Sequence, residues 1–146
     1  MVEDNSFHGL GGAGVALFNS PFEGLCATRH VVQRNTMLDT NQLGGDPTTT
    51  GAARVSAFPS AAAPPFCHRD LLFLNNTIEK GPGAPLTANG IDGLVARGNV
   101  LVRCAEDATG AIEVDNAANV DVEDASNVVV NKTGDWICVK PPTGHR

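Results

Sequence analysis

Acidic side chains are the first residues in this sequence that could do chemistry, because two carboxyl groups held about 5 to 9.5 Å apart can cleave a glycosidic bond. The candidates are Glu23, Asp46, Asp70, Asp92 and Glu113. Of these, Asp70 and Asp92 are expected to lie near each other. Arg69 flanks both, and a neighbouring guanidinium favours the charged carboxylate over the protonated form that a general acid needs. Asp70 and Asp92 are therefore catalytic candidates whose surroundings argue against that role.

Glu23 is a separate catalytic candidate, because it lies in a loop, where functional residues concentrate. Arg29 and His30 follow it in the chain, and this group suggests contact with a substrate. His68 and Arg69 are the other candidates for substrate binding. Together with the aspartate that follows them, these two residues resemble a catalytic set. Adjacent residues of a strand point to opposite faces, however, so the three side chains cannot converge.

The same charged residues also have a purely structural interpretation. Stacking of the repeats described below would place three pairs of opposite charges side by side: Asp4 with Arg34, Arg29 with Asp70, and Arg69 with Asp92. Opposite charges on neighbouring strands stabilise a sheet by roughly 0.2 to 1 kcal/mol per pair. An outward-facing charge ladder is the favoured interpretation, and a site remains the alternative.

The elements that would position these residues follow from a repeat centred on asparagine. Four segments share the pattern apolar, two residues, Asn, one residue, apolar; they centre on Asn5, Asn35, Asn76 and Asn99, with a fifth, looser turn near Asn127 or Asn131. The inward pairs would be Val2 and Phe7, Val32 and Met37, Phe73 and Ile78, and Ala96 and Leu101. Stacked asparagine amides can hydrogen-bond along a column, which gives a reason to repeat Asn at one corner. We expect a structural asparagine ladder at these positions.

A second alternating run follows each asparagine. The inward residues of these runs would be Val15 and Leu17, Val55 and Ala57, Leu86 and Ala88, and Ile112 and Val114. Period-2 alternation bounded by turn residues indicates short strands, and helical spacing does not persist in any window. The pattern predicts an all-β parallel β-helix of about five coils over residues 1–140, with a disordered tail over 141–146. The alternative is an antiparallel β-sandwich.

Two of the four cysteines share a column in this register. Counting back nine residues from Asn35 and from Asn76 reaches Cys26 and Cys67. The strand spacing of about 4.8 Å is within the Cα separation of a disulfide, and buried free thiols are the alternative. The opening segment MVEDNSF lacks the features of a secretory leader, so free thiols are favoured. The other two cysteines lack the spacing of a zinc site, and we expect no metal and no cofactor.

Two segments resemble right-handed parallel β-helix proteins of the pectate-lyase-like superfamily. They are CATRHVVQRNTM and CHRDLLFLNNTIEKGPGAPLTANGIDGLVARGNVLV. The likeness spans residues 1–139. Within this superfamily, the segment VALFNSPFEG with the coil that follows it resembles the late coils of β-helix glycoside hydrolases such as α-1,3-galactosidases. Members of that group carry an upstream Asp-Asp segment that supplies the catalytic carboxylates, and this chain has no Asp-Asp pair. The resemblance implies a truncated domain without its catalytic half, and secretion if the true N-terminus is missing.

Composition limits the partners. Only 18% of the residues are charged and the formal net charge is −6, so no basic surface for nucleic acid or an anionic membrane is expected. We expect a module related to carbohydrate-active enzymes that binds an oligosaccharide or polysaccharide and is inactive alone. If it is active, it would be a glycoside hydrolase or polysaccharide lyase. The alternative is a stand-alone structural or protein-interaction solenoid that associates end to end through its open edges.

Overall fold

The protein is described here from a computed structural model that defines residues 1–18, 26, 28–38, 40, 52–56, 67–79, 84–104, 111–123 and 125–132. This part of the chain is built from strands and contains no helix. The strands are β1 (Val2–Glu3), β2 (Ser6–His8), β3 (Val15–Phe18), β4 (Thr28–Gln33), β5 (Thr36–Leu38), β6 (Ala53–Ser56), β7 (His68–Leu74), β8 (Thr77–Glu79), β9 (Leu86–Arg97), β10 (Val100–Cys104), β11 (Ile112–Val122) and β12 (Val128–Lys132). The predicted domain end at residue 140 and the predicted tail lie outside the described residues. No helix in the described ranges has the length and apolar character needed to cross a membrane.

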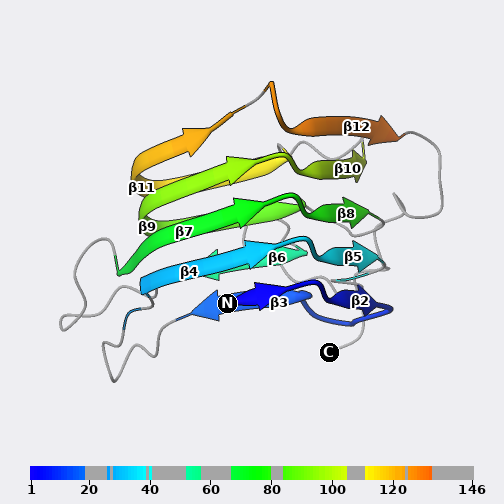
Figure 1. Ribbon diagram of the computed structural model, residues 1–146, viewed down its shortest axis with the longest axis horizontal. Coiled ribbons are helices and arrows are strands. Elements are labelled where there is room, and N and C mark those ends of the chain that lie inside the picture. Colours follow the sequence, from blue (N-terminus) through cyan, green and yellow to red (C-terminus); the bar gives the residue numbers. More distant parts are fainter. Residues whose placement is uncertain are drawn as a thin grey trace, which may run out of the picture.

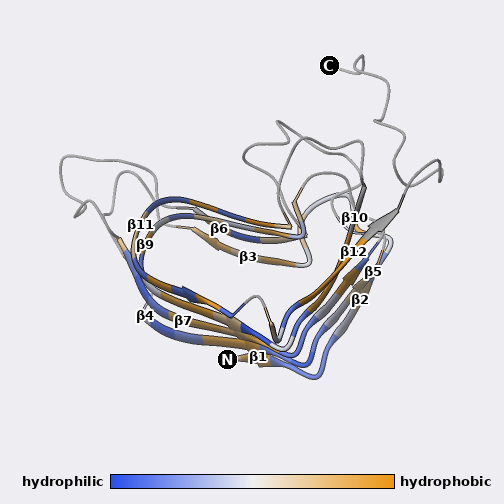
Figure 2. Ribbon diagram, turned by 90° about the horizontal axis from the view of Figure 1, so that it is seen from above, coloured by the Kyte–Doolittle hydropathy of each residue, from blue (hydrophilic) through white to orange (hydrophobic). Residues whose placement is uncertain are grey.

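All strand pairs in these ranges are parallel, and they form a sheet of seven strands and a sheet of five. The first wall contains β1, β4, β7 and the second half of β9, and the third wall contains β3, β6 and the first half of β9. The second wall is the sheet β2-β5-β8-β10-β12. β11 follows β9 along both of its halves. Successive coils therefore stack in parallel (Figure 1) around a shared interior (Figure 2), as the sequence predicts for a parallel β-solenoid.

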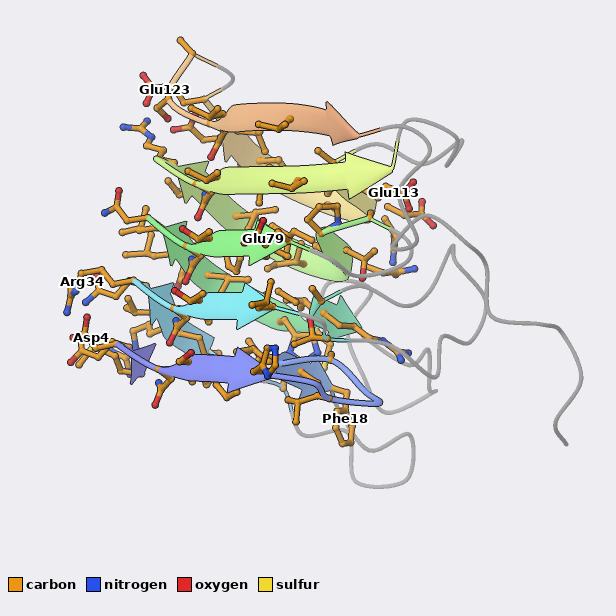
Figure 3. The ribbon with its side chains drawn as sticks, turned by 90° about the vertical axis from the view of Figure 1, so that its right-hand side faces the viewer. Asp4, Phe18, Arg34, Glu79, Glu113 and Glu123 are labelled. Atoms are coloured by element: carbon orange, nitrogen blue, oxygen red, sulfur yellow. A yellow bond between two sulfur atoms is a disulfide. The ribbon has the colours of Figure 1, made fainter. Side chains whose placement is uncertain are left out.

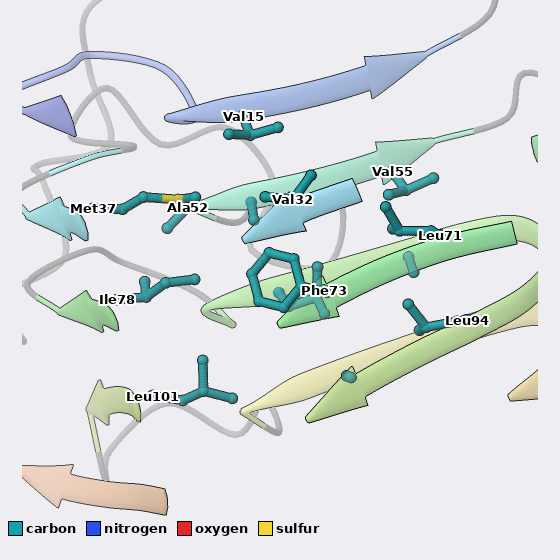
Figure 4. Packing of buried hydrophobic residues seen from close by; sticks show 14 of the residues in the cluster. Val15, Val32, Met37, Ala52, Val55, Leu71, Phe73, Ile78, Leu94 and Leu101 are labelled. Carbon is teal, nitrogen blue, oxygen red and sulfur yellow. The ribbon is translucent and has the colours of Figure 1, made fainter. Parts of the chain in front are cut away.

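The predicted inward residues of the first two walls align from coil to coil. The two columns are Val2, Val32, Phe73 and Ala96 on the first wall, and Phe7, Met37, Ile78 and Leu101 on the second. The six residues from the second to the fourth coil are at most 2% exposed. They belong to the apolar core drawn in Figure 4. Burial of each larger side chain contributes roughly 1.5 to 3 kcal/mol, so these columns fix the register.

Val55, one of the two inward residues predicted for the third wall at β6, is buried as expected. The sequence pattern takes Val55 and Ala57 as the inward pair, whereas β6 ends at residue 56 and its buried apolar residues are Ala53 and Val55. Val15 consequently pairs with Ala53. Ala57 lies outside the described residues. Alternation alone fits either choice, because a shift of two residues leaves the same side chains facing inward.

The asparagines form a hydrogen-bonded column at the corner between the first and second walls. Its members are Asn5, Asn35, Asn76, Asn99 and Asn127. Asn35 Nδ2 donates to Asn76 Oδ1 at 3.0 Å, and Asn76 Nδ2 donates to Asn99 Oδ1 at 3.2 Å. Asn99 Nδ2 donates to Asn127 Oδ1 at 2.8 Å, so Asn127 and not Asn131 is the fifth member. The ladder satisfies polar groups that the turn would otherwise leave buried and unpaired.

The residue before each of the first four ladder asparagines adopts a left-handed backbone conformation. These residues are Asp4, Arg34, Asn75 and Gly98, with φ between 53° and 66°. The strained geometry recurs because the stacked coils impose it: the backbone N–H of Arg34 donates to Leu74 O, and that of Asn75 donates to Arg97 O. Left-handed geometry costs an L-residue roughly 1 to 2 kcal/mol, and glycine avoids this cost.

Replacing Gly98 with alanine is expected to lower the free energy of unfolding by about 1 to 2 kcal/mol. Its φ of +66° is unfavourable for alanine, and the new Cβ would collide with Asn75 Oδ1. Chemical denaturation followed by far-UV circular dichroism measures the change. Gly12→Ala is the matched control, because a Cβ at Gly12 meets no atom within 4 Å. Equal stabilities for the two variants would contradict this account of the corner.

One predicted charge pair is an ion pair, and the register aligns the others. Arg34 Nε donates to Asp4 Oδ1 at 2.7 Å (Figure 3). Arg34 Nη2 also donates to Glu3 Oε2 at 3.0 Å. Arg69 pairs with Asp92 in the strand register. The neighbouring pairs Thr28 with Arg69 and His30 with Leu71 bring Arg29 level with Asp70. A further ion pair, which the sequence did not predict, joins Arg97 to Asp121.

The hydrogen bond from Arg34 holds the pKa of Asp4 below its ordinary value of 3.8. A lowered pKa in the folded state means that the pair stabilises the fold above pH 3.8 and that this contribution is lost as the pH falls below it. We expect Asp4→Asn to reduce slightly the loss of stability at acid pH. The effect should be small because the side chains of Asp4 and Arg34 are both exposed and solvent screens their attraction. Urea midpoints measured from pH 6 to pH 2 test this. A larger fall of the urea midpoint at low pH in the variant than in the parent protein would contradict this expectation.

The two stacked cysteines form a disulfide, which corrects the preference for free thiols. Cys26 and Cys67 are bonded, and their Cα atoms lie 5.0 Å apart. The nine-residue offset from the ladder therefore places them in one column, and the spacing of adjacent coils suits the bridge. The preference for thiols came from the apparent absence of a leader, which concerns the cellular compartment and not the geometry.

Candidate functional site

A second left-handed column marks the corner between the third and first walls. It contains Arg29, Asp70, Gly93 and Asn119, with φ from 51° to 87°. Non-glycine residues adopt left-handed backbone angles only where the surrounding structure holds them, and such residues concentrate at functional sites. Three of the four carry polar side chains, and all three of those side chains are exposed. This corner therefore presents polar groups to solvent in successive coils.

Four polar residues of the third, fourth and fifth coils lie in or next to this column. Asn119 Nδ2 donates to Asp92 Oδ1 at 2.6 Å. Asp70 Oδ1 lies 3.1 Å from the position that a Cβ would occupy at Gly93, so the absence of a side chain there makes room for the carboxylate. Arg69 is the register neighbour of Asp92. We call Arg69, Asp70, Asp92 and Asn119 the polar corner.

The polar corner combines two carboxylates, an amide and a guanidinium on one outward edge. Arg69, Asp70 and Asn119 are exposed, and Asp92 is half-buried. These groups can donate to and accept from the hydroxyl groups of a bound molecule. Among the described residues, no group of three or more histidine, cysteine or acidic side chains is arranged to hold a metal ion. The arrangement suits hydrogen-bonded recognition of a polar ligand.

The structure brings some predicted site residues together and separates others. Asp70, Asp92 and Arg69 lie at the polar corner, and Arg29 occupies the left-handed column one coil below. The histidines lie elsewhere, as described next, and Glu23 falls outside the described residues.

Both candidate histidines lie in columns of the solenoid interior. His30 pairs with Leu71, which in turn pairs with Leu94, and both leucines are buried. His68 is 2% exposed and pairs with the buried Ile91. Arg69 and Asp70 are both exposed, because the left-handed backbone at Asp70 interrupts the alternation of the strand, whereas His68 is buried. The three side chains therefore do not converge, as expected, but only His68 faces away from the other two. The two histidines are not part of the polar corner.

Asn119 is the member of the site that sequence reasoning missed. In three coils the left-handed residue lies six positions before the ladder asparagine, as Gly93 does before Asn99. In the last coil the interval between Asn119 and Asn127 is eight, because the turn before Asn127 holds two extra residues. Alignment of the first-wall strand itself, IDGLVA with AANVDV, would have found the position.

Comparisons of the chain with protein-family models, with curated proteins and with solved structures found no match.

Proposed function

We propose that the chain is a right-handed parallel β-helix module related to the pectate-lyase-like carbohydrate-active proteins, and that it binds an oligosaccharide or polysaccharide at the polar corner. The observation that carries the proposal is the placement of polar side chains on consecutive coils around Gly93: Asn119 is hydrogen-bonded to Asp92, Asp70 lies against Gly93, and Arg69 is in register with Asp92. Carboxylates, amides and guanidinium groups are planar and can bond two neighbouring hydroxyl groups of a sugar ring at once.

The stacking of coils supports recognition of an extended chain of sugars. Equivalent positions on neighbouring coils are separated by the strand spacing of about 4.8 Å. A saccharide lying parallel to the solenoid axis would therefore meet one set of polar groups per coil, from Arg29 through Asp70 to Asn119. The left-handed backbone repeats at these positions, so the side chains leave successive coils in similar directions.

Binding without catalysis is the simpler assignment for this corner. Glycoside hydrolysis requires the substrate to lie between two carboxyl groups with a defined separation and opposite roles. Asp70 and Asp92 instead lie on adjacent coils of one exposed outer edge, and Asp92 already accepts a hydrogen bond from Asn119. We therefore propose that the module lacks a complete catalytic site of its own.

A glycan array followed by calorimetric titration of the hits tests the proposal. Asp92→Ala should weaken binding of a hit at least tenfold, because it removes the central carboxylate of the polar corner. Arg97→Ala is the matched control: Arg97 is also exposed on the first wall, at its opposite edge, and should leave binding unchanged. An array without any hit, or equal weakening by both substitutions, would overturn the assignment. Release of reducing sugar would overturn the proposed lack of catalysis.

A further inference from the structure

The outer face of the third wall carries two polar side chains next to each other on adjacent coils. Arg54 on β6 and Thr87 on β9 are register partners, and β3 and β11 flank these two strands on either side. Their strand neighbours Ala53, Val55 and Leu86 belong to the apolar core. Successive side chains of a strand alternate between its two faces. Arg54 and Thr87 therefore leave the wall on its outer side.

Both side chains hold a buried polar atom that lacks a hydrogen-bond partner. Arg54 Nε and Thr87 Oγ1 are buried, and neither atom has a partner in the described structure. Thr87 is only 6% exposed, and Arg54 is half-buried. Buried polar groups of folded proteins are nearly always paired, because an unpaired group has lost its hydrogen bonds to water without replacement. Two such atoms on neighbouring strands indicate a ligand that bonds both.

The acidic residue of the same column does not pair with Arg54. Glu113 on β11 follows Thr87 in the register, so two strand spacings, or about 9.6 Å, separate its backbone from that of Arg54. The ion pairs among the described residues involve Arg34 and Arg97 and not Arg54. Glu113 takes part in an interaction of its own. Within the described residues, the positive charge of Arg54 therefore has no carboxylate partner.

We propose that Arg54 and Thr87 bind the carboxylate group of a small molecule on the outer face of the third wall. The Nε–H and one Nη–H of a guanidinium form a planar fork that matches the two oxygens of a carboxylate. The hydroxyl group of Thr87 donates a further hydrogen bond to one of these oxygens. Such bonds are stronger where water is excluded, as it is around Arg54 Nε and Thr87 Oγ1.

The surrounding charges favour a ligand with one negative charge over a phosphate group with two. Glu113 lies one coil beyond Thr87, and Asp115 lies two residues further along the same strand, on the same face. These carboxylates repel each additional negative charge on a ligand. Ala16, the register partner of Arg54 on its other side, adds no positive charge that would offset this repulsion. A carboxylate therefore suits this column better than a phosphate group.

Titration of the whole protein with sodium acetate, followed by NMR, tests the site. We expect the Nε–H resonance of Arg54 and the backbone amide resonance of Thr87 to shift and to saturate together, while the Nε–H resonance of Arg97 stays unchanged. Sodium chloride at equal ionic strength measures non-specific anion effects, and inorganic phosphate should bind roughly tenfold more weakly than acetate. No saturating shift at Arg54, equal shifts with chloride, or phosphate binding as tight as acetate would each overturn the proposal.

Conservative variants separate recognition by the guanidinium fork from attraction to a positive charge. Arg54→Lys keeps the charge but lacks the fork, and it should weaken acetate binding roughly tenfold. Thr87→Val removes the hydroxyl group and should weaken binding about threefold to tenfold, whereas Thr87→Ser should retain it. Arg97→Lys is the matched control, because Arg97 is exposed and already paired with Asp121, and it should leave binding unchanged. Equal effects of Arg54→Lys and Arg97→Lys would contradict the assignment.

The carboxylate site and the polar corner are tested separately. Asp92→Ala, which should weaken glycan binding, keeps Arg54 and Thr87 and should leave acetate binding unchanged. Failure of one site therefore says nothing against the other. Far-UV circular dichroism shows whether each variant is folded. If Arg54→Lys does not fold, the two threonine variants decide the result, since equal acetate affinities of Thr87→Val and Thr87→Ser would overturn the proposal.

Discussion

Replacing Asn76 with alanine is expected to lower the free energy of unfolding by about 4 kcal/mol. Asn76 is fully buried; its Oδ1 accepts from the backbone N–H of Asn35 at 3.0 Å, and its Nδ2 donates to Val32 O at 3.0 Å. Alanine would leave both backbone groups buried without partners, at roughly 1 to 3 kcal/mol each. Because a domain of this size is stable by about 5 to 15 kcal/mol, guanidinium unfolding followed by far-UV circular dichroism will resolve the loss.

The position of the asparagine within the ladder provides the control. Asn5→Ala removes an exposed side chain that donates to Glu3 O and Asn35 Oδ1, so we expect a loss of about 1 kcal/mol or less in the free energy of unfolding. Asn76→Asp should be at least as harmful as alanine at neutral pH, because it loses the donor and buries a charge. If Asn76→Ala lowers the free energy of unfolding by no more than Asn5→Ala does, the buried hydrogen bonds of the ladder do not stabilise the fold as argued.

The register of the fold could be predicted because two independent patterns agree on it. The asparagine marks one corner of each coil, and the apolar residues three before and two after it, such as Phe73 and Ile78 around Asn76, alternate as strands require. Where the asparagine marker was distant, as at Val55, alternation alone left a two-residue ambiguity. Hydrophobic burial specifies which face of a strand points inward but is unaffected by a shift of two residues.

The site could be predicted only in part, for a similar reason. Asp70 and Asp92 were expected to be neighbours because they fall at adjacent positions in consecutive coils. Asn119 was missed because the turn before Asn127 is longer, which breaks the constant interval from the ladder. After that longer turn, the backbone N–H and Nδ2 of Asn127 both donate to Glu123 O. The change from an interval of six residues to one of eight therefore marks a turn that differs in structure from the earlier ones.

Removing the disulfide is expected to lower the free energy of unfolding by about 4 kcal/mol. The bridge between Cys26 and Cys67 closes a loop of 41 residues, and the chain-entropy relation gives about this value for such a loop. The double variant Cys26→Ser and Cys67→Ala is suitable, because Cys67 is 1% exposed and alanine avoids a buried hydroxyl group. Guanidinium unfolding of the variant and the parent protein measures the difference.

The denaturant dependence tests whether the bridge acts through the unfolded chain. Loss of a cross-link lets the unfolded state expose more surface, so the slope of free energy against denaturant should rise in the variant. The local effect in the folded state should be small, because β4 and β7 remain paired along the first wall from Thr28 with Arg69 to Gln33 with Leu74. A variant with unchanged slope and unchanged midpoint would indicate that the two cysteines are free thiols, since a pair of thiols constrains neither state.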